Sequence, residues 1–515
     1  MTSPTVTLDG SSLTIDEVVR VARDPRVAAV LAPAAIDGVA RSRARIDAAL
    51  EQGDTIYGVN TGFGKLASVR IAPDALDRLQ ENLIRSHCAG VGEPLPADIV
   101  RASMLLRENV LLRPTSGVRP DLLHALRDLL NSGLVPVVPE QGSVGASGDL
   151  APLSHIALVL MGEGDVLTRS GERVAAAAAL REAGLTPHRF GTKEGLAFIN
   201  GTQVQTAVLA LAVHDAWVLW RSALGAAAMS LEALRGTPSA LDPRIHAARP
   251  HDGQKLAAAL MRSLLDRSEI RESHRDDDPR VQDAYSLRCA PQIMGAVADA
   301  IRFAEQTVSI ELNASTDNPL VFETGDVLSG GNFHGQPIAQ ALDILTIAMT
   351  TLQGLAERRI ERLVNPDLSQ GLPAFLTSDP GLGSGYMMVQ VTAASLVAES
   401  RTLAYPASVT SIPTDANQED FVPMSMAAAF KARRVLANAQ RVTAAEFLCA
   451  AQGLDFLRPL KPGRGVADLF RRIRTDHPPI EPLESDRPPA PDIEQLAVRI
   501  AEGALDPQAY LPSDR

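Results

Sequence analysis

Residues 142–149 read Gly-Ser-Val-Gly-Ala-Ser-Gly-Asp and lie immediately before a predicted helix that begins near Leu150. Gly148 has no Cβ, so its amide nitrogen can approach the carbonyl carbon of Ala146 in a turn that most side chains would block. If that bond forms and two waters are lost, Ser147 becomes a methylidene on an imidazolone ring, which is a carbon electrophile. The triplet Ala146-Ser147-Gly148 is therefore a candidate site of self-modification.

The residues after the triplet favour a helix start. Asp149 is a typical N-cap residue and Pro152 is tolerated in a first helical turn, so the triplet is expected at the positive end of a helix dipole. Taken alone, the stretch has two other interpretations. One is a plain glycine-rich turn. The other is the nucleophile elbow Gly-x-Ser-x-Gly of a serine hydrolase, but Asp149 occupies its last position, so that motif is not met.

The composition of the 515-residue chain favours a helical protein of two or three domains. Hydrophobic residues make up 45% and aromatic residues only 4%, which suits helices packed on helices. The formal net charge of −12, without a long basic run, argues against nucleic acid or an anionic membrane as a partner. Cys88, Cys289 and Cys449 form no Cys-x-x-Cys pair, so neither a disulfide nor a metal site is expected. Because no signal peptide is visible, we expect a cytoplasmic protein.

Hydrophobic periodicity predicts several long helices. Leu76, Leu79, Leu83 and Ile84 fall at i, i+3, i+7 and i+8, which predicts an amphipathic helix over 74–87. Further helices are expected over residues 207–234, 338–364, 387–403, 424–454 and 493–502. Short strands are expected at 134–138 and, as a hairpin that turns at Thr324-Gly325, at 321–328.

This pattern predicts a mainly α fold with a long helical bundle. We expect an N-terminal domain over residues 1–200 that carries the triplet and a central bundle over 201–475. A Pro-rich stretch from His477 to Asp492 and a C-terminal helix then make up residues 476–515.

Tyr57 begins a second glycine-rich loop, Tyr-Gly-Val-Asn-Thr-Gly-Phe-Gly, over residues 57–64. No Gly-Lys-Ser/Thr follows, so the loop is not a phosphate cradle. A tyrosine in such a loop can act as a general base if cations or helix termini lower its pKa. The alternative is a tyrosine that packs beside a turn.

Gln282, Tyr285 and Arg288 are spaced three residues apart, which on a helix brings them towards one face. A guanidinium in a pocket can grip a substrate carboxylate through two hydrogen bonds. The alternative for Arg288 is a surface salt bridge.

Three further features have a simple interpretation when each is taken alone. Residues 330–335 form another glycine-lined polar loop, and residues 415–420 read Asp-Ala-Asn-Gln-Glu-Asp, an acidic run of the kind that is usually a solvated helix start. His87 is by itself more typical of a packed histidine than of a ligand.

Together, these segments resemble the aromatic amino acid ammonia-lyase family, in its order and over roughly residues 50 to 455. The matching segments are Tyr-Gly-Val-Asn-Thr-Gly-Phe-Gly (57–64), Asn-Leu-Ile-Arg-Ser-His (82–87), Gly-Ser-Val-Gly-Ala-Ser-Gly-Asp-Leu-Ala-Pro-Leu-Ser-His (142–155), Asn-Gly-Thr-Gln (200–203), Tyr-Ser-Leu-Arg-Cys (285–289), Ser-Gly-Gly-Asn-Phe-His (329–334) and Asn-Gln-Glu-Asp (417–420).

The resemblance implies a mainly α, fumarase/aspartase-like architecture and a homotetramer whose active sites draw on several subunits. It implies elimination of ammonia from an L-amino acid by a carbon–nitrogen lyase. The electrophile would be 4-methylideneimidazole-5-one (MIO), formed by Ala146, Ser147 and Gly148 with no external cofactor. Tyr57 would be the base that removes the β-proton.

The resemblance also implies roles for the remaining site residues. Arg288 would hold the substrate carboxylate, and Phe333 would line the pocket. Asn200, Gln282 and Tyr285 would orient the substrate amine, the substrate carboxylate and the prosthetic ring. Of these three, Tyr285 would be a catalytic residue.

His87 and Glu419 would meet the substrate side chain and so decide the substrate. Glu419 in Asn-Gln-Glu-Asp is the pattern of lyases that act on histidine, whereas lyases for phenylalanine or tyrosine tend to have Asn-Gln-Asp. Three departures from the pattern leave other aryl amino acids, or a 2,3-aminomutase outcome, as alternatives: Phe421 and Pro423 replace common His and Ser, and Ala284 replaces a common Pro. A catalytically inactive helical interaction protein is the alternative from another class.

Overall fold

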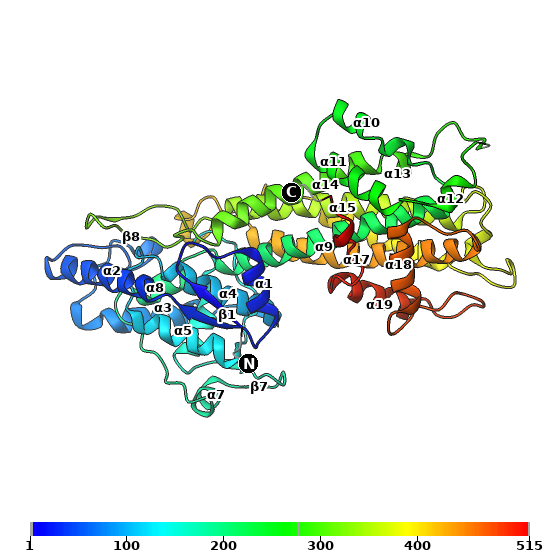
Figure 1. Cartoon of the computed structure of the whole chain (residues 1–515). Coiled ribbons are helices and arrows are strands. Elements are labelled where there is room, and N and C mark those ends of the chain that lie inside the picture. The colour runs from blue at the N-terminus through cyan, green and yellow to red at the C-terminus, as the bar shows by residue number, and fades with distance from the viewer. Residues whose placement is uncertain (1–3, 277, 513–515) are drawn as a thin grey trace. The chain divides into compact units, whose positions relative to one another are not determined.

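Two compact units make up the chain, whose computed structural model describes residues 4–276 and 278–512 (Figure 1). Unit 1 consists of Met1–His214, Ala304–Asp343 and Pro406–Phe430. Unit 2 consists of Asp215–Phe303, Ile344–Tyr405 and Lys431–Arg515. Each unit thus combines three stretches that are far apart in sequence, and the domain limits expected at residues 200 and 475 stay a prediction.

Unit 1 is built on short helices around the buried helix α4. Its α-helices are α1 (Ile15–Arg23), α2 (Pro33–Glu51), α3 (Leu76–His87), α4 (Ala97–Leu111), α5 (Pro120–Ser132), α6 (Leu150–Leu160), α7 (Ala176–Glu182) and α8 (Glu194–Ile199). Every α4 residue from Ile99 to Leu111 is buried, and α1 and α5 pack against it. The helix predicted over residues 74–87 is confirmed as α3, whose Leu83 and Ile84 are buried.

Strands in the described residues are two to four residues long. Strands β1 (Thr5–Leu8) and β2 (Ala28–Leu31) pair in parallel. The other pairings are antiparallel: β3 (Val91–Pro94) with β5 (Pro139–Gln141), and β8 (Leu320–Val321) with β9 (Val327–Leu328). Strand β6 (Asp165–Leu167) lies between β4 (Val135–Pro136) and β7 (Arg173–Ala175) and pairs antiparallel with both. The predicted hairpin is confirmed, since Leu320 pairs with Leu328 and Gly325 turns the chain at a φ of +94°.

Unit 2 is a helical bundle. Four long helices have residues in both units: α9 (Gln203–Ala233), α14 (Ala290–Glu311), α15 (Gln336–Val364) and α17 (Ser425–Phe456). The other α-helices of unit 2 are α10 (Pro243–Ala248), α11 (Asp252–Leu264), α12 (Glu269–Glu272), α13 (Tyr285–Arg288), α16 (Met387–Leu403), α18 (Arg464–Thr475) and α19 (Ala490–Ala501). Short 3₁₀ turns are η1 (Gly64–Leu66), η2 (Pro73–Ala75), η3 (Pro238–Leu241), η4 (Ala374–Leu376), η5 (Asp415–Asn417) and η6 (Gln508–Tyr510). The long helices predicted from hydrophobic periodicity thus occur as α9, α15, α16 and α17.

A buried ion pair joins three helices inside unit 2. Arg359 on α15 donates from Nε to Glu446 Oε1 on α17 at 2.5 Å, and both side chains are fully buried. Ser230 on α9 donates to the same carboxylate at 2.7 Å. Because a charge that loses its partner in a protein interior costs several kcal/mol, this cluster fixes how the three helices pack.

Helices α9 and α15 are long and apolar enough to cross a membrane by length and composition alone. However, 78% of the apolar window of α9 and 67% of that of α15 are buried inside the structure. Helices that are apolar around much of their circumference are typical of protein cores, and burial accounts for both of these.

Candidate active site

The triplet Ala146-Ser147-Gly148 lies in a tight turn directly before α6. Gly145 and Gly148 have φ values of +75° and +73° and pair with each other across the turn. A Cβ added to Gly148 would lie 2.6 Å from the nitrogen of Gly201 and closer still to its carbonyl group. Only glycine fits this position. The predicted cyclisation also requires a residue without a Cβ here, so the structure meets that requirement.

Asp149 does not cap α6, although the sequence predicted that it would. Its side chain makes no capping bond to α6. Instead, Oδ2 accepts hydrogen bonds from the backbone nitrogens of Val204 and Gln205, each at 2.9 Å, in the first turn of α9, and Oδ1 accepts one from Ser143 Oγ at 3.0 Å. The carboxylate thus caps a helix that is distant in sequence and fastens it to the turn. Burial raises the pKa of Asp149 to about 6.

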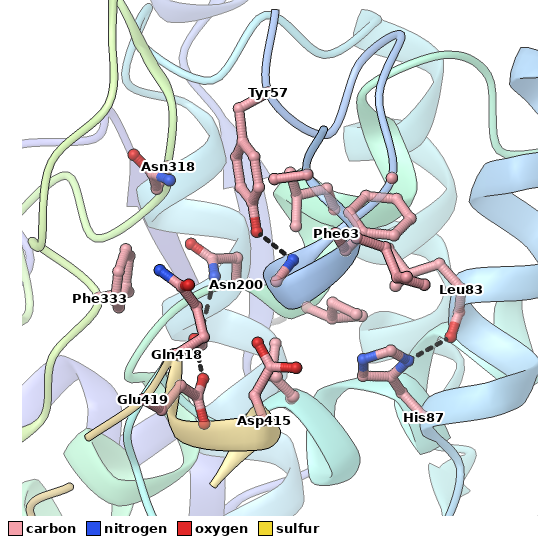
Figure 2. Close-up of a pocket in the computed structure, with 18 of the residues that line it drawn as sticks. Tyr57, Phe63, Leu83, His87, Asn200, Asn318, Phe333, Asp415, Gln418 and Glu419 are labelled. Carbon is pink, nitrogen blue, oxygen red and sulfur yellow. Dashed lines mark hydrogen bonds between the residues drawn. The ribbon is translucent and has the colours of Figure 1, made fainter. Parts of the chain in front are cut away.

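A cavity of about 1120 Å³ in unit 1 brings together residues from seven separate segments (Figure 2). The predicted site residues that line it are Tyr57, His87, Ala146, Ser147, Asn200, Phe333 and Glu419. Three acidic side chains line the cavity, those of Asp415, Glu419 and Asp420, and the described lining residues include no lysine or arginine. The cavity within unit 1 is therefore acidic.

Tyr57 lies in this cavity with its hydroxyl oxygen tied to its own loop. The backbone nitrogen of Gly64 donates to Tyr57 Oη at 3.0 Å, as the dashed line in Figure 2 shows. Burial raises the pKa of Tyr57, and the nearby charges of Asp415 and Glu419 raise it further, whereas the hydrogen bond from Gly64 lowers it. The lining of the cavity therefore holds the pKa of Tyr57 above its ordinary value.

Asn200, which ends α8, contacts the triplet directly. Its Nδ2 donates to the backbone oxygen of Ser147 at 3.2 Å. Its Oδ1 is buried and has no hydrogen-bond partner among the described residues. An unpaired buried acceptor costs about 1 to 3 kcal/mol, so this oxygen is suited to a ligand's N–H group.

Glu419 joins the triplet to the turn at η5. Ser147 Oγ donates to Glu419 Oε1 at 2.5 Å, and Thr414 Oγ1 donates to Glu419 Oε2 at 2.5 Å. The backbones of Thr414 and Glu419 also pair with each other. The carboxylate is thereby held against the serine that the sequence singles out.

His87, the last residue of α3, presents a defined tautomer. Its Nδ1 lies 2.9 Å from the carbonyl oxygen of Leu83, and because a carbonyl only accepts, Nδ1 carries the proton. Burial lowers the pKa of His87, although the hydrogen bond to Leu83 and the charges of Glu419 and Asp415 oppose that change. A neutral ring with a protonated Nδ1 leaves Nε2 as an acceptor, and Figure 2 shows that nitrogen on the cavity side.

Gln282, Tyr285 and Arg288 belong to unit 2 and do not line this cavity. The expectation of a shared helical face is wrong for Gln282, because α13 covers only Tyr285–Arg288. The Arg288 guanidinium carbon lies 4.5 Å from the centre of the Tyr285 ring, and its Nε donates to the Asp283 carbonyl at 2.9 Å. Tyr285 is 67% exposed.

Several polar residues that line the cavity were not predicted as site residues, among them Asn318, Asp415 and Gln418. Asp415 and Gln418 lie in the acidic run that was expected to be solvated. The run is exposed as expected, apart from the half-buried Glu419, and it forms a turn in which Asp415, Ala416 and Asn417 all have positive φ values. Hydrophobic periodicity does not predict a turn of this kind.

Phe421, one of the departures from the family pattern, also lines the cavity. Its ring stacks on that of His334, with 6.5 Å between the ring centres, and its carbonyl oxygen lies 3.1 Å from His334 Nε2. An apolar ring therefore replaces a polar one at this edge of the site.

Comparison with known proteins places the chain in a class that fits this site. The family model for aromatic amino acid lyases matches residues 13–475, and the chain belongs to that family. Among curated relatives, histidine ammonia-lyase from Gloeobacter violaceus is 52% identical over 499 residues, which cover 97% of this chain and 96% of the relative. The predicted family and the predicted carbon–nitrogen lyase class are confirmed.

Solved structures agree with the mainly helical fold. The crystal structure of histidine ammonia-lyase from Trypanosoma cruzi matches with a TM-score of 0.91 at 43% identity, covering 99% of this chain and 96% of that one. A tyrosine aminomutase from Streptomyces globisporus matches with a TM-score of 0.91 at 40% identity, covering 99% of both chains. The prediction of a mainly α fold of this family is confirmed.

Proposed function

We propose that this chain is a histidine ammonia-lyase that converts L-histidine into trans-urocanate and ammonia. The observation that carries the proposal is that His87 and Glu419 line the same cavity as Ser147. The identity of 52% with a histidine ammonia-lyase over nearly the whole chain supports the same substrate.

The turn at Ala146-Ser147-Gly148 fits the MIO group that the family resemblance implies. Gly148 has the positive φ and the crowded Cβ position that a tight turn requires, and the Ser147 hydroxyl lines the cavity. When formed, the group supplies an electrophile that turns the substrate amine into a better leaving group. Asn200 Nδ2 would hold the group through the backbone oxygen of Ser147.

His87 and Glu419 give the cavity two contacts for an imidazole. The unprotonated Nε2 of His87 can accept the substrate ring N–H, and the Glu419 carboxylate can accept a second N–H or stabilise a positive ring. A phenyl ring has no N–H group and would leave Nε2 of His87 without a donor, at a cost of about 1 to 3 kcal/mol, whereas Glu419 keeps its hydrogen bond from Thr414. The cavity therefore favours histidine over phenylalanine.

Tyr57 Oη is the proposed acceptor of the β-proton. As the Cβ–H bond breaks, its electron pair forms the Cα–Cβ double bond, and the Cα–N bond breaks with release of ammonia. The Oδ1 atom of Asn200, which has no partner among the described residues, can accept from the substrate amine. Phe333 would line the pocket as an apolar wall.

A second copy of the chain would complete the site. The substrate carboxylate needs a cation, yet the described lining residues of the unit 1 cavity include no lysine or arginine. We therefore propose a homotetramer in which Gln282, Tyr285 and Arg288 of another copy reach the cavity. The exposure of Tyr285 is consistent with such a role, and a guanidinium near Tyr57 would lower its pKa. A cytoplasmic location is part of the same proposal.

The substrate is tested by incubating the purified protein with L-histidine, L-tyrosine or L-phenylalanine and following near-ultraviolet absorbance. We expect urocanate to form from histidine and no product to form from tyrosine or phenylalanine. Absence of urocanate would refute the proposed substrate, and a β-amino acid among the products would indicate an aminomutase instead.

Shared sites are tested by co-expressing two inactive variants, Tyr57→Phe and Arg288→Ala. If Arg288 acts in a neighbouring copy's cavity, mixed oligomers contain sites with both residues intact and regain activity. If both residues serve a site within one chain, no site has both intact, and the mixture stays inactive.

A further inference from the structure

Asp415 contacts the Tyr57 loop although 350 residues separate it from Lys65. Its Oδ2 accepts a hydrogen bond from the backbone nitrogen of Lys65 at 3.1 Å. The same carboxylate lies against Gly64, where an added Cβ would be 2.8 Å from Asp415 Cγ and 3.0 Å from Oδ1. The carboxylate therefore covers the two residues that follow Phe63.

Gly64 connects this contact to Tyr57. Its backbone nitrogen donates to Tyr57 Oη at 3.0 Å, and its φ of +51° is one that side chains rarely adopt. Asp415 on one side and Tyr57 on the other thus hold the same short turn, η1.

Asp415 begins η5, and Glu419 follows two residues after η5 ends and pairs through its backbone with Thr414. In this turn, Asp415, Ala416 and Asn417 have φ values of +46°, +52° and +66°. Non-glycine residues keep such conformations only where the surroundings hold them, since each costs about 1 to 3 kcal/mol. The hydrogen bond from Lys65 N to Asp415 and the backbone pairing of Thr414 with Glu419 hold η5 in place.

We propose that Asp415 is a positioning residue for the elimination. Its carboxylate fastens the Tyr57 loop to the segment from Thr414 to Glu419, and so fixes the position of Tyr57 Oη relative to Glu419. The catalytic meaning of this contact rests on the proposed function, in which Tyr57 is the base. The contact itself does not depend on that function.

Amide hydrogen exchange tests the contact without substrate. Peptides that contain Gly64 and Lys65 should exchange about tenfold faster in Asp415→Ala, because one hydrogen bond to a carboxylate is lost. Asp415→Asn keeps an acceptor oxygen and should retain most of the protection. Asp420→Ala is the matched control, since it removes a carboxylate that lines the same cavity and makes no described contact with this loop.

Kinetics with L-histidine then test the positioning role. Asp415→Ala should lower kcat at least tenfold with KM changed less than threefold, because the loop holds the base and not the substrate side chain, and Asp415→Asn should recover most of kcat. If the alanine variant does not fold, Asp415→Ser makes the same comparison, because its hydroxyl is too short to reach Lys65. Unchanged exchange in the alanine or serine variant, or an equal increase in Asp420→Ala, would overturn the proposal. Wild-type protein that is inactive on histidine would refute the proposed function and leave the exchange result intact.

Discussion

Replacing Gly148 with alanine should prevent self-modification of the triplet. Gly148 has a φ of +73°, which costs an alanine about 1 to 2 kcal/mol. An added Cβ would also lie 2.6 Å from Gly201 N, well inside the ordinary contact distance of about 3.5 to 4.0 Å. Overpacking of this kind adds about 1 to 3 kcal/mol, so the total destabilisation should be about 2 to 5 kcal/mol.

The Gly201 backbone cannot yield freely, because its carbonyl oxygen accepts from Asp149 N at 2.7 Å and its neighbour Asn200 holds Ser147. The strain should therefore open the turn and keep Gly148 N away from the Ala146 carbonyl carbon.

Gly184→Ala is the matched control. Gly184 has nearly the same φ, +70°, and no atom lies within 4 Å of an added Cβ, so this variant carries the strain without the clash. Intact-mass spectrometry should show that Gly148→Ala retains both waters, whereas Gly184→Ala and wild type lose them. Thermal denaturation should show a larger loss of stability for Gly148→Ala. The reasoning would be refuted if Gly148→Ala lost both waters and denatured at the same temperature as Gly184→Ala.

Three further changes test the site and the fold. Ser147→Ala removes the leaving hydroxyl and should abolish turnover; full activity with L-histidine would contradict the proposed chemistry. Glu419→Gln should lower kcat/KM for histidine by about 10- to 100-fold, the worth of a hydrogen bond to a charged group, without preventing the loss of the two waters; an unchanged kcat/KM would argue against a contact between Glu419 and the substrate. Glu232, which accepts from Gly463 N at 3.0 Å, has its pKa raised by burial from 4.5 to about 7. The unfolded chain ionises first, so stability should fall by about 3 kcal/mol as pH rises from 4.5 to 7 and stay lower above that range. Glu232→Gln should flatten this dependence in denaturation measurements, and an unchanged pH profile would show that Glu232 does not cause it.

The local structure follows from the order of residues along the chain. Helix α16 begins and ends where the apolar pattern predicts, at Met387 and Leu403, because helical periodicity is a property of neighbouring residues. Helix α3 ends at His87 as predicted and begins at Leu76, slightly later than predicted. At the triplet, local backbone geometry requires a glycine at Gly148. The family motifs likewise indicated Tyr57 and Glu419 without any knowledge of their distance.

Which side chains contact one another depends on how distant stretches of the chain pack together. Asp149 was expected to cap α6, yet its carboxylate binds the first turn of α9, because a buried carboxylate takes whichever backbone donors the packing presents. Asp415 lies in an exposed acidic run, as expected, and its carboxylate also contacts Lys65 across 350 residues. Such contacts depend on the folding of distant stretches into one unit, and no local pattern of residues records them.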